Sequence, residues 1–274
     1  MKATNQFIKS LLSTLYLVLF FLVYYWGKTV PLKAAEYLAP GYFDGLFDLD
    51  FGRMGLRVSC LLSLLALYFA AELLLFRRPL SRMSLRWQPG FAWGAAIGAL
   101  MVMVTIGLTL VTGAVVINGF ELAPIVIAGT IGSYVLAMSM TAFTEELLLR
   151  GILLDGLARE WGATAAVWIT AILFGVLHWP AGGTYAIMAL LLGLFLGYAY
   201  LDRGLYWCIG WHFAWNSIES IFYSGSIVHF TVLDTALAGA RQMSPDRLGW
   251  LVLPVVVVGL IVYLLWAPTS SAKK

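Results

Sequence analysis

Long apolar runs, separated by short polar breaks, cover almost the whole chain. A helix needs about 20 apolar residues to cross the hydrocarbon core of a bilayer, and eight runs come close to that length or exceed it. The pattern predicts an all-α fold, a polytopic membrane helical bundle with about eight transmembrane helices, formed as a single membrane domain by residues 1–274. The expected spans are residues 8–27, 55–76, 91–117, 124–158, 162–180, 184–201, 204–223 and 248–267.

The breaks between the runs predict connections rather than further domains. The longest break, residues 29–54, mixes acidic residues with tyrosine and phenylalanine, which is typical of an amphipathic interfacial loop at the membrane surface. The Pro- and Gly-rich break at residues 180–183 predicts a turn between two helices. Small residues at Gly193 and Gly197 predict a close helix contact in the sixth span.

The composition supports the membrane class and narrows the set of partners. Of the 274 residues, 61% are hydrophobic and 11% are charged, whereas a soluble domain carries about 25% charged residues. The net charge is +3, and the cations stand at the ends of apolar runs rather than on one basic face, so we expect no nucleic-acid partner. Cys60 and Cys208 lie in apolar stretches, which favours neither a disulfide framework nor a thiolate metal site.

Positive charges predict the orientation of the chain. The break between the second and third spans carries Arg77, Arg78, Arg82 and Arg86 with no acidic residue among them. Short loops rich in arginine and lysine face the cytoplasm. An even number of spans then places both termini on that side. We therefore expect an integral protein of the bacterial inner membrane with both termini cytoplasmic.

Two adjacent acidic residues, Glu145 and Glu146, lie inside the fourth span. A charged group at membrane depth costs about 3 kcal/mol or more, so such groups usually face a cavity or a partner and mark chemistry or transport. Glu146 and Arg150 are four residues apart and can pair on one helix face. Glu145 lies about a third of a turn away and points elsewhere. The spacing predicts a structural or accessory ion pair beside a reactive carboxylate.

Two pairs of residues downstream have the spacing of one helical turn. Phe174 and His178 form the first pair, and His212 and Asn216 form the second. Residues four apart share a helix face, so each pair presents its side chains together.

The fourth and fifth spans predict a hairpin that brings Glu145 and His178 to one depth. The break at residues 159–162 lies midway between the two residues in the sequence. In an antiparallel pair of helices, residues equally far from the turn lie at the same level. We therefore expect the carboxylate and the imidazole to meet, with His212 and Asn216 converging on them from the seventh span.

These residue types suit peptide hydrolysis. A carboxylate beside an imidazole can bind and deprotonate a water molecule, which makes Glu145 and His178 the expected general base. A second histidine with an asparagine one turn away provides hydrogen-bond donors for the oxygen that becomes negative when water adds to a carbonyl. His212 and Asn216 are therefore the expected oxyanion hole.

Together the three motifs resemble those of the CPBP group of intramembrane proteases, which includes the type II CAAX prenyl endopeptidases and the bacterial Abi proteins. The family pattern EExxxR stands at residues 145–150, FxxxH at residues 174–178 and HxxxN at residues 212–216. The resemblance covers residues 124–223, which would form the catalytic core. It implies a membrane fold of eight helices with the motif-bearing helices at its centre.

The resemblance also implies a role for each motif residue. Glu145 and His178 would activate the water, and His212 and Asn216 would stabilise the oxyanion. Glu146, Arg150 and Phe174 would support the site. The implied activity is that of an intramembrane endopeptidase, with a membrane-associated peptide or protein as its substrate and the lipid bilayer as its surroundings.

A metal-dependent protease site is the alternative interpretation of the same residues. Glu145, His178 and His212 could hold zinc with water in a fourth, open position. The sequence contains no HExxH helix, and Asn216 is a good donor but an unusual neighbour for a metal ligand. We therefore favour a site without a cofactor.

A non-enzymatic membrane protein, such as an immunity or transport-accessory factor that binds a peptide or lipid, is the alternative function. A transporter would tend to show paired broken helices or an internal repeat, and neither is visible in the sequence. Four groups with complementary hydrolytic roles favour the enzyme. The remaining histidine, His229, stands in a loop-like stretch with no motif, and we expect it to be a packing hydrogen-bond donor rather than a catalytic residue.

Overall fold

The computed structural model describes residues 89–238 and 249–266, together with residues 14–15, 37, 58, 61–66, 68–69, 73 and 85. The predicted first span, the arginine-rich loop and almost all of the interfacial loop at residues 29–54 lie outside the described residues, as does much of the second span. The chain divides into two compact units. One comprises residues 1–87 and 143–166, and the other comprises residues 88–142 and 167–274.

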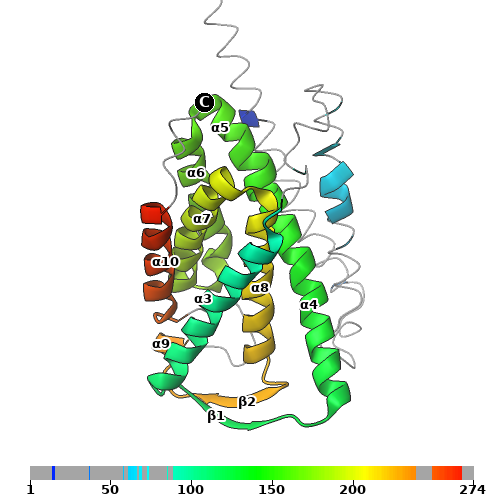
Figure 1. Cartoon of the computed structure of the whole chain (residues 1–274), viewed down its shortest axis with the longest axis vertical. Helices are drawn as coiled ribbons and strands as arrows, with labels where there is room; N and C mark the ends of the chain where they lie inside the picture. Colours follow the sequence, from blue (N-terminus) through cyan, green and yellow to red (C-terminus); the bar gives the residue numbers. More distant parts are fainter. Residues whose placement is uncertain are drawn as a thin grey trace, which may run out of the picture. The chain divides into compact units, whose positions relative to one another are not determined.

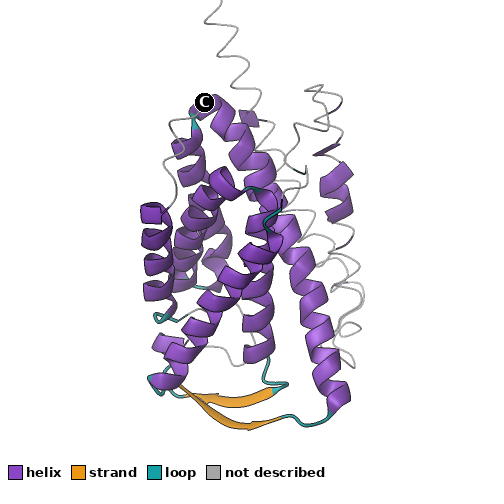
Figure 2. Cartoon of the chain, in the orientation of Figure 1, coloured by secondary structure: helices purple, strands orange, loops and turns teal. Residues whose placement is uncertain are grey.

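Helices dominate the described residues, as the apolar runs predicted (Figure 2). The six predicted spans from residue 91 onward each correspond to helix, and the predicted turn after residue 161 is confirmed by Gly162, whose φ is +86°. The helices are α3 (Phe91–Val111), α4 (Pro124–Glu146), η3 (Leu147–Leu154), α5 (Asp155–Trp161), α6 (Ala163–His178), η4 (Trp179–Ala181), α7 (Gly183–Arg203), α8 (Leu205–Tyr223), α9 (Thr235–Ala238) and α10 (Val252–Trp266).

Three helical segments of the described chain are long and apolar enough to cross a membrane. They are Phe91–Val111, Pro124–Trp161 and Gly183–Arg203. Ala163–His178 and Val252–Leu265 are shorter apolar helices. The predicted number of eight spans stays a prediction.

A two-stranded sheet corrects the prediction of a purely helical fold. Strand β1 (Val115–Phe120) pairs antiparallel with β2 (Val228–Val232), where α3 and α8 end (Figure 1). The predicted span 91–117 was too long, because helix α3 ends at Val111. Gly113 then adopts a φ of +71°, which favours glycine, and the β-branched residues that follow favour a strand. His229, expected in a loop, lies exposed in β2.

Glycines allow α3 and α8 to pack backbone against backbone. A Cβ atom added to Gly94 would lie 2.0 Å from the carbonyl oxygen of Trp207, and one added to Gly98 would lie 2.3 Å from that of Trp211. On α8, a Cβ at Gly210 would lie 2.1 Å from the carbonyl oxygen of Phe91. The contact partner on α8 moves from Trp207 to Trp211 as the glycine on α3 moves from Gly94 to Gly98, so the two helices run in the same direction. This contact holds the helix that carries the HxxxN motif.

Replacing Gly98 with alanine is expected to lower the free energy of unfolding by about 1–3 kcal/mol, because extra volume in a packed interface forces backbone shifts. Gly107 on the same helix is the matched control, since nothing lies within 4 Å of a Cβ added there. Gly107→Ala should be neutral or stabilise the helix by up to about 1 kcal/mol. Unfolding in denaturing detergent measures both variants, and equal effects would contradict the close contact.

The close helix contact predicted at the small residues of α7 is confirmed, and its partner is α6. A Cβ at Gly193 would lie 2.8 Å from the Cα atom of Ala171, and one at Gly197 would lie 2.9 Å from Cγ1 of Val167. Both partners belong to α6, the helix that carries the FxxxH motif. Close packing of α7 therefore supports this motif.

Candidate active site

The EExxxR motif lies at the junction of α4 and η3. Glu146 is the last residue of α4, and its Oε1 accepts a hydrogen bond of 2.8 Å from Nη1 of Arg150. Both side chains are buried, with 0% of Glu146 and 1% of Arg150 exposed. The predicted ion pair is therefore confirmed. Glu145, one residue earlier, is half-buried in the last turn of α4.

A π-helix carries Arg150. All eight residues of η3 are buried, and seven of them are apolar or glycine. The wider turn of a π-helix is rare, and single turns of this kind are frequent at functional sites. This π-helix was not predicted, because the apolar run from residue 147 to residue 154 has no feature that separates a π-helix from an α-helix.

The second unit brings the FxxxH and HxxxN motifs together. The centre of the Phe174 ring lies 4.5 Å from that of His178 and 6.2 Å from that of His212, and both imidazoles meet the phenyl ring edge-on. Phe174 and His212 are buried, whereas His178 at the end of α6 is half-buried. One aromatic ring thus joins two histidines from separate helices.

A hydrogen bond within α6 determines which nitrogen of His178 carries the proton. Nδ1 of His178 lies 2.7 Å from the carbonyl oxygen of Phe174. A carbonyl oxygen only accepts, so Nδ1 donates, and in the neutral imidazole Nε2 keeps the lone pair. Among the described residues, Nε2 of His178 has no hydrogen-bond partner. Nε2 is therefore the atom that can accept a proton.

Tyr185 completes the aromatic surroundings of His178. Its ring centre lies 5.0 Å from that of His178, across the turn between α6 and α7. Tyr185 was not predicted as a site residue, because it belongs to no motif and only the turn at Trp179–Ala181 brings it back to the histidine.

Asn216 lies half-buried on α8, one turn beyond His212. Its side-chain amide makes no hydrogen bond among the described residues. The amide can therefore donate to a ligand.

Glu145 belongs to the first compact unit, whereas His178 and His212 belong to the second. Their predicted convergence therefore stays a prediction. The same holds for zinc bound by these three residues. Within the second unit, the described His, Cys, Asp and Glu side chains form no group of three that could hold a metal ion.

A comparison with family models identifies the segment that contains all three motifs. Residues 127–218 match the family described as Type II CAAX prenyl endopeptidase Rce1-like. The match confirms the resemblance that the motifs indicated. No curated protein and no solved structure matches the chain. Together with the long apolar helices, this match to a protease family indicates an integral membrane protein.

Proposed function

Because residues 127–218 form an Rce1-like domain, we propose that this protein is an intramembrane endopeptidase that hydrolyses a peptide bond of a membrane-associated substrate. The observation that supports this most is the packing of the two motif histidines against Phe174, within the segment that matches a protease family. A binding protein would have no need for two histidines packed against one aromatic ring in such a segment.

Water activation is the proposed role of Glu145 and His178. With Nδ1 bonded to the carbonyl of Phe174, Nε2 of His178 remains as the hydrogen-bond acceptor. It orients the water while the carboxylate of Glu145 takes the proton. The hydroxide then forms a bond to the carbonyl carbon of the substrate. The negative charge moves to the carbonyl oxygen.

Oxyanion stabilisation is the proposed role of His212 and Asn216. The amide of Asn216 and the imidazole of His212 donate hydrogen bonds to the oxygen that becomes negative. When the intermediate collapses, the bond between carbon and nitrogen breaks. Glu145 returns its proton to the leaving amine, which restores the carboxylate for the next turnover.

The three histidines of the chain provide a test with a built-in control. His178→Ala and His212→Ala should each lower kcat by at least about 10²-fold, since each removes an acid–base group or an oxyanion donor. His229→Ala should leave kcat unchanged, because this residue lies exposed on β2. Membrane peptidomes of cells with and without the protein identify the cleaved peptide, and turnover is then measured in proteoliposomes. Unchanged cleavage by both motif variants would favour the non-enzymatic binding protein.

Treatment with a metal chelator is expected to leave peptidase activity largely intact, because water activation is assigned to Glu145 and His178. The assay uses the purified protein in proteoliposomes, dialysed against chelator and then against buffer with or without zinc. A loss of activity that zinc restores would instead favour a metal held by Glu145, His178 and His212, with water in the fourth position.

A further inference from the structure

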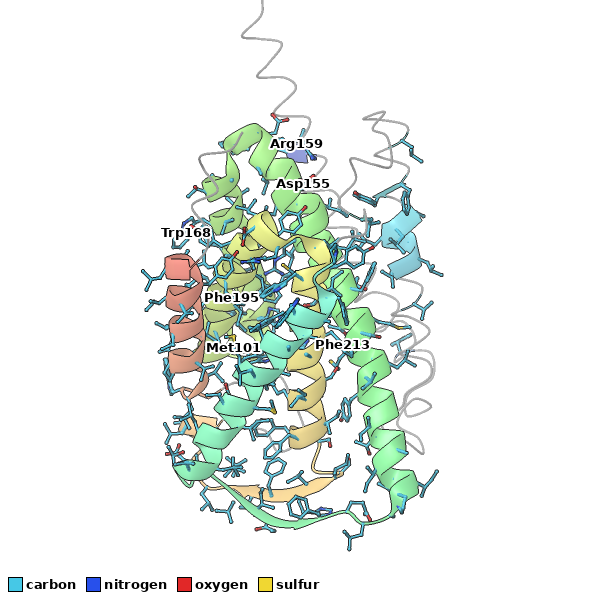
Figure 3. The ribbon with its side chains drawn as sticks, in the orientation of Figure 1. Met101, Asp155, Arg159, Trp168, Phe195 and Phe213 are labelled. Atoms are coloured by element: carbon cyan, nitrogen blue, oxygen red, sulfur yellow. The ribbon has the colours of Figure 1, made fainter. Side chains whose placement is uncertain are left out.

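An apolar cavity of about 720 Å³ lies between α3 and α10, apart from the motif residues. Its walls include Leu100 and Met101 of α3, Val258 and Val262 of α10, and Phe195 of α7. Figure 3 labels Met101 and Phe195. None of the residues that line this cavity belongs to the EExxxR, FxxxH or HxxxN motifs.

The cavity is an open groove along the helices. Its lining on α3 runs from Trp93 to Leu108, which corresponds to a length of about 22 Å at 1.5 Å per residue. Trp93 and Val258 are 75% and 57% exposed, so one side of the groove is open. An open apolar groove of this length in a membrane protein suits a single hydrocarbon chain.

The groove has a charged group at one end only. Arg203, the last residue of α7, lines the cavity beside Tyr263 of α10. Nε of Arg203 bonds to Oδ2 of Asp202 at 2.6 Å, and the hydroxyl of Tyr263 donates to the same carboxylate oxygen at 3.2 Å. Asp202 thus binds the guanidinium group of Arg203 at its Nε atom.

The terminal nitrogens of Arg203 can bind an anion. Among the described residues, its two Nη atoms have no partner, and 51% of the side chain is exposed. A guanidinium fork matches a phosphate group in geometry and charge. The arginine also lies between the sixth and seventh predicted spans, on the predicted cytoplasmic side, where lipid headgroups meet water.

We infer that this groove binds one phospholipid, with an acyl chain between α3 and α10 and its phosphate on Arg203. The apolar walls account for the chain, and the half-exposed guanidinium accounts for the anionic headgroup. Lipids that only surround the protein without a specific site would not require a charged residue at one end of the groove. The groove is separate from the motif residues of the proposed peptidase site.

The test measures lipid retention by native mass spectrometry. Delipidated full-length protein is titrated with phosphatidylglycerol and, separately, with a diacylglycerol that has the same acyl chains but no phosphate. Arg203→Gln removes the phosphate partner. Gly259→Leu fills the groove, because a Cβ there would already lie 2.7 Å from the flexible end of Met101. The controls are Arg159→Gln, at another exposed arginine, and Gly129→Leu, at a helical glycine with nothing within 4 Å.

The intact protein and both controls should bind one phosphatidylglycerol at least about tenfold more tightly than diacylglycerol, as expected for a hydrogen bond to a charged group. Arg203→Gln should remove this preference, and Gly259→Leu should weaken binding of both lipids. Arg203 is at the surface, so its variant tests the site even if Gly259→Leu does not fold. Equal binding of the two lipids by the intact protein, or an unchanged preference in Arg203→Gln, would overturn the inference. Tighter binding of farnesyl phosphate than of phosphatidylglycerol would replace the phospholipid with an isoprenoid.

Discussion

Glu145→Gln is expected to lower kcat for peptide hydrolysis by about 10²–10⁴-fold, the range that a positioned general base contributes. Glutamine keeps the size of the side chain and removes its ability to accept a proton from water. Substrate binding should persist, so KM should change much less than kcat. Turnover of the identified peptide by purified protein in proteoliposomes measures both constants.

The matched control for this carboxylate is Glu160→Gln. Glu160 lies exposed near the end of α5, in the same compact unit as Glu145 and outside the three motifs. Its replacement should leave kcat within about twofold, because surface changes away from a site alter little. If Glu145→Gln retains full kcat while remaining folded, the water must be activated by another group and the mechanism proposed above is wrong.

Breaking the buried ion pair is expected to have the largest effect on stability. Arg150→Met leaves the carboxylate of Glu146 buried without its cation, and such losses cost about 3–5 kcal/mol. The same helical run provides an exposed pair of equal spacing, Asp155 with Arg159, which Figure 3 labels. Arg159→Met should cost no more than about 1 kcal/mol, since solvent screens an exposed pair. Unfolding in denaturing detergent compares the two variants.

A double variant separates the two roles of this ion pair. Glu146→Leu combined with Arg150→Met removes both charges, and it should recover most of the lost stability because no buried charge remains. A folded double variant that cleaves substrate normally would show a structural role. A folded but inactive one would add Glu146 and Arg150 to the catalytic groups. Equal costs for Arg150→Met and Arg159→Met would contradict the burial of the pair.

Local features were predictable from the sequence because they depend on neighbours along the chain. Apolar runs located the helices, and the spacing of Glu146 and Arg150 located an ion pair that the structure confirms. The end of α3 was misjudged, because Val115 and Val116 continue the apolar run in composition while their backbone belongs to β1. Hydropathy does not distinguish a strand of apolar residues from the last turn of a helix.

The candidate site was predictable in its residue types and only partly in its geometry. Helical spacing placed each motif on one face. The contact of His178 with Tyr185, and the ring of Phe174 shared by two histidines, depend on the turn after α6 and on the approach of α8. The periodicity of residues along each helix does not determine which faces of two helices pack together. The groove beside Arg203 was missed for the same reason.

The amino-acid sequence alone determined the membrane class, the helical segments after residue 90, the three motifs and their resemblance to a protease family, because hydrophobicity and residue spacing act locally. The tertiary structure decided which residues meet. It paired β1 with β2, set α3 against α8 through glycine backbones and brought the ring of Phe174 against His212. These contacts arise from packing between segments far apart in the sequence, and close packing depends on shapes that a linear pattern does not carry.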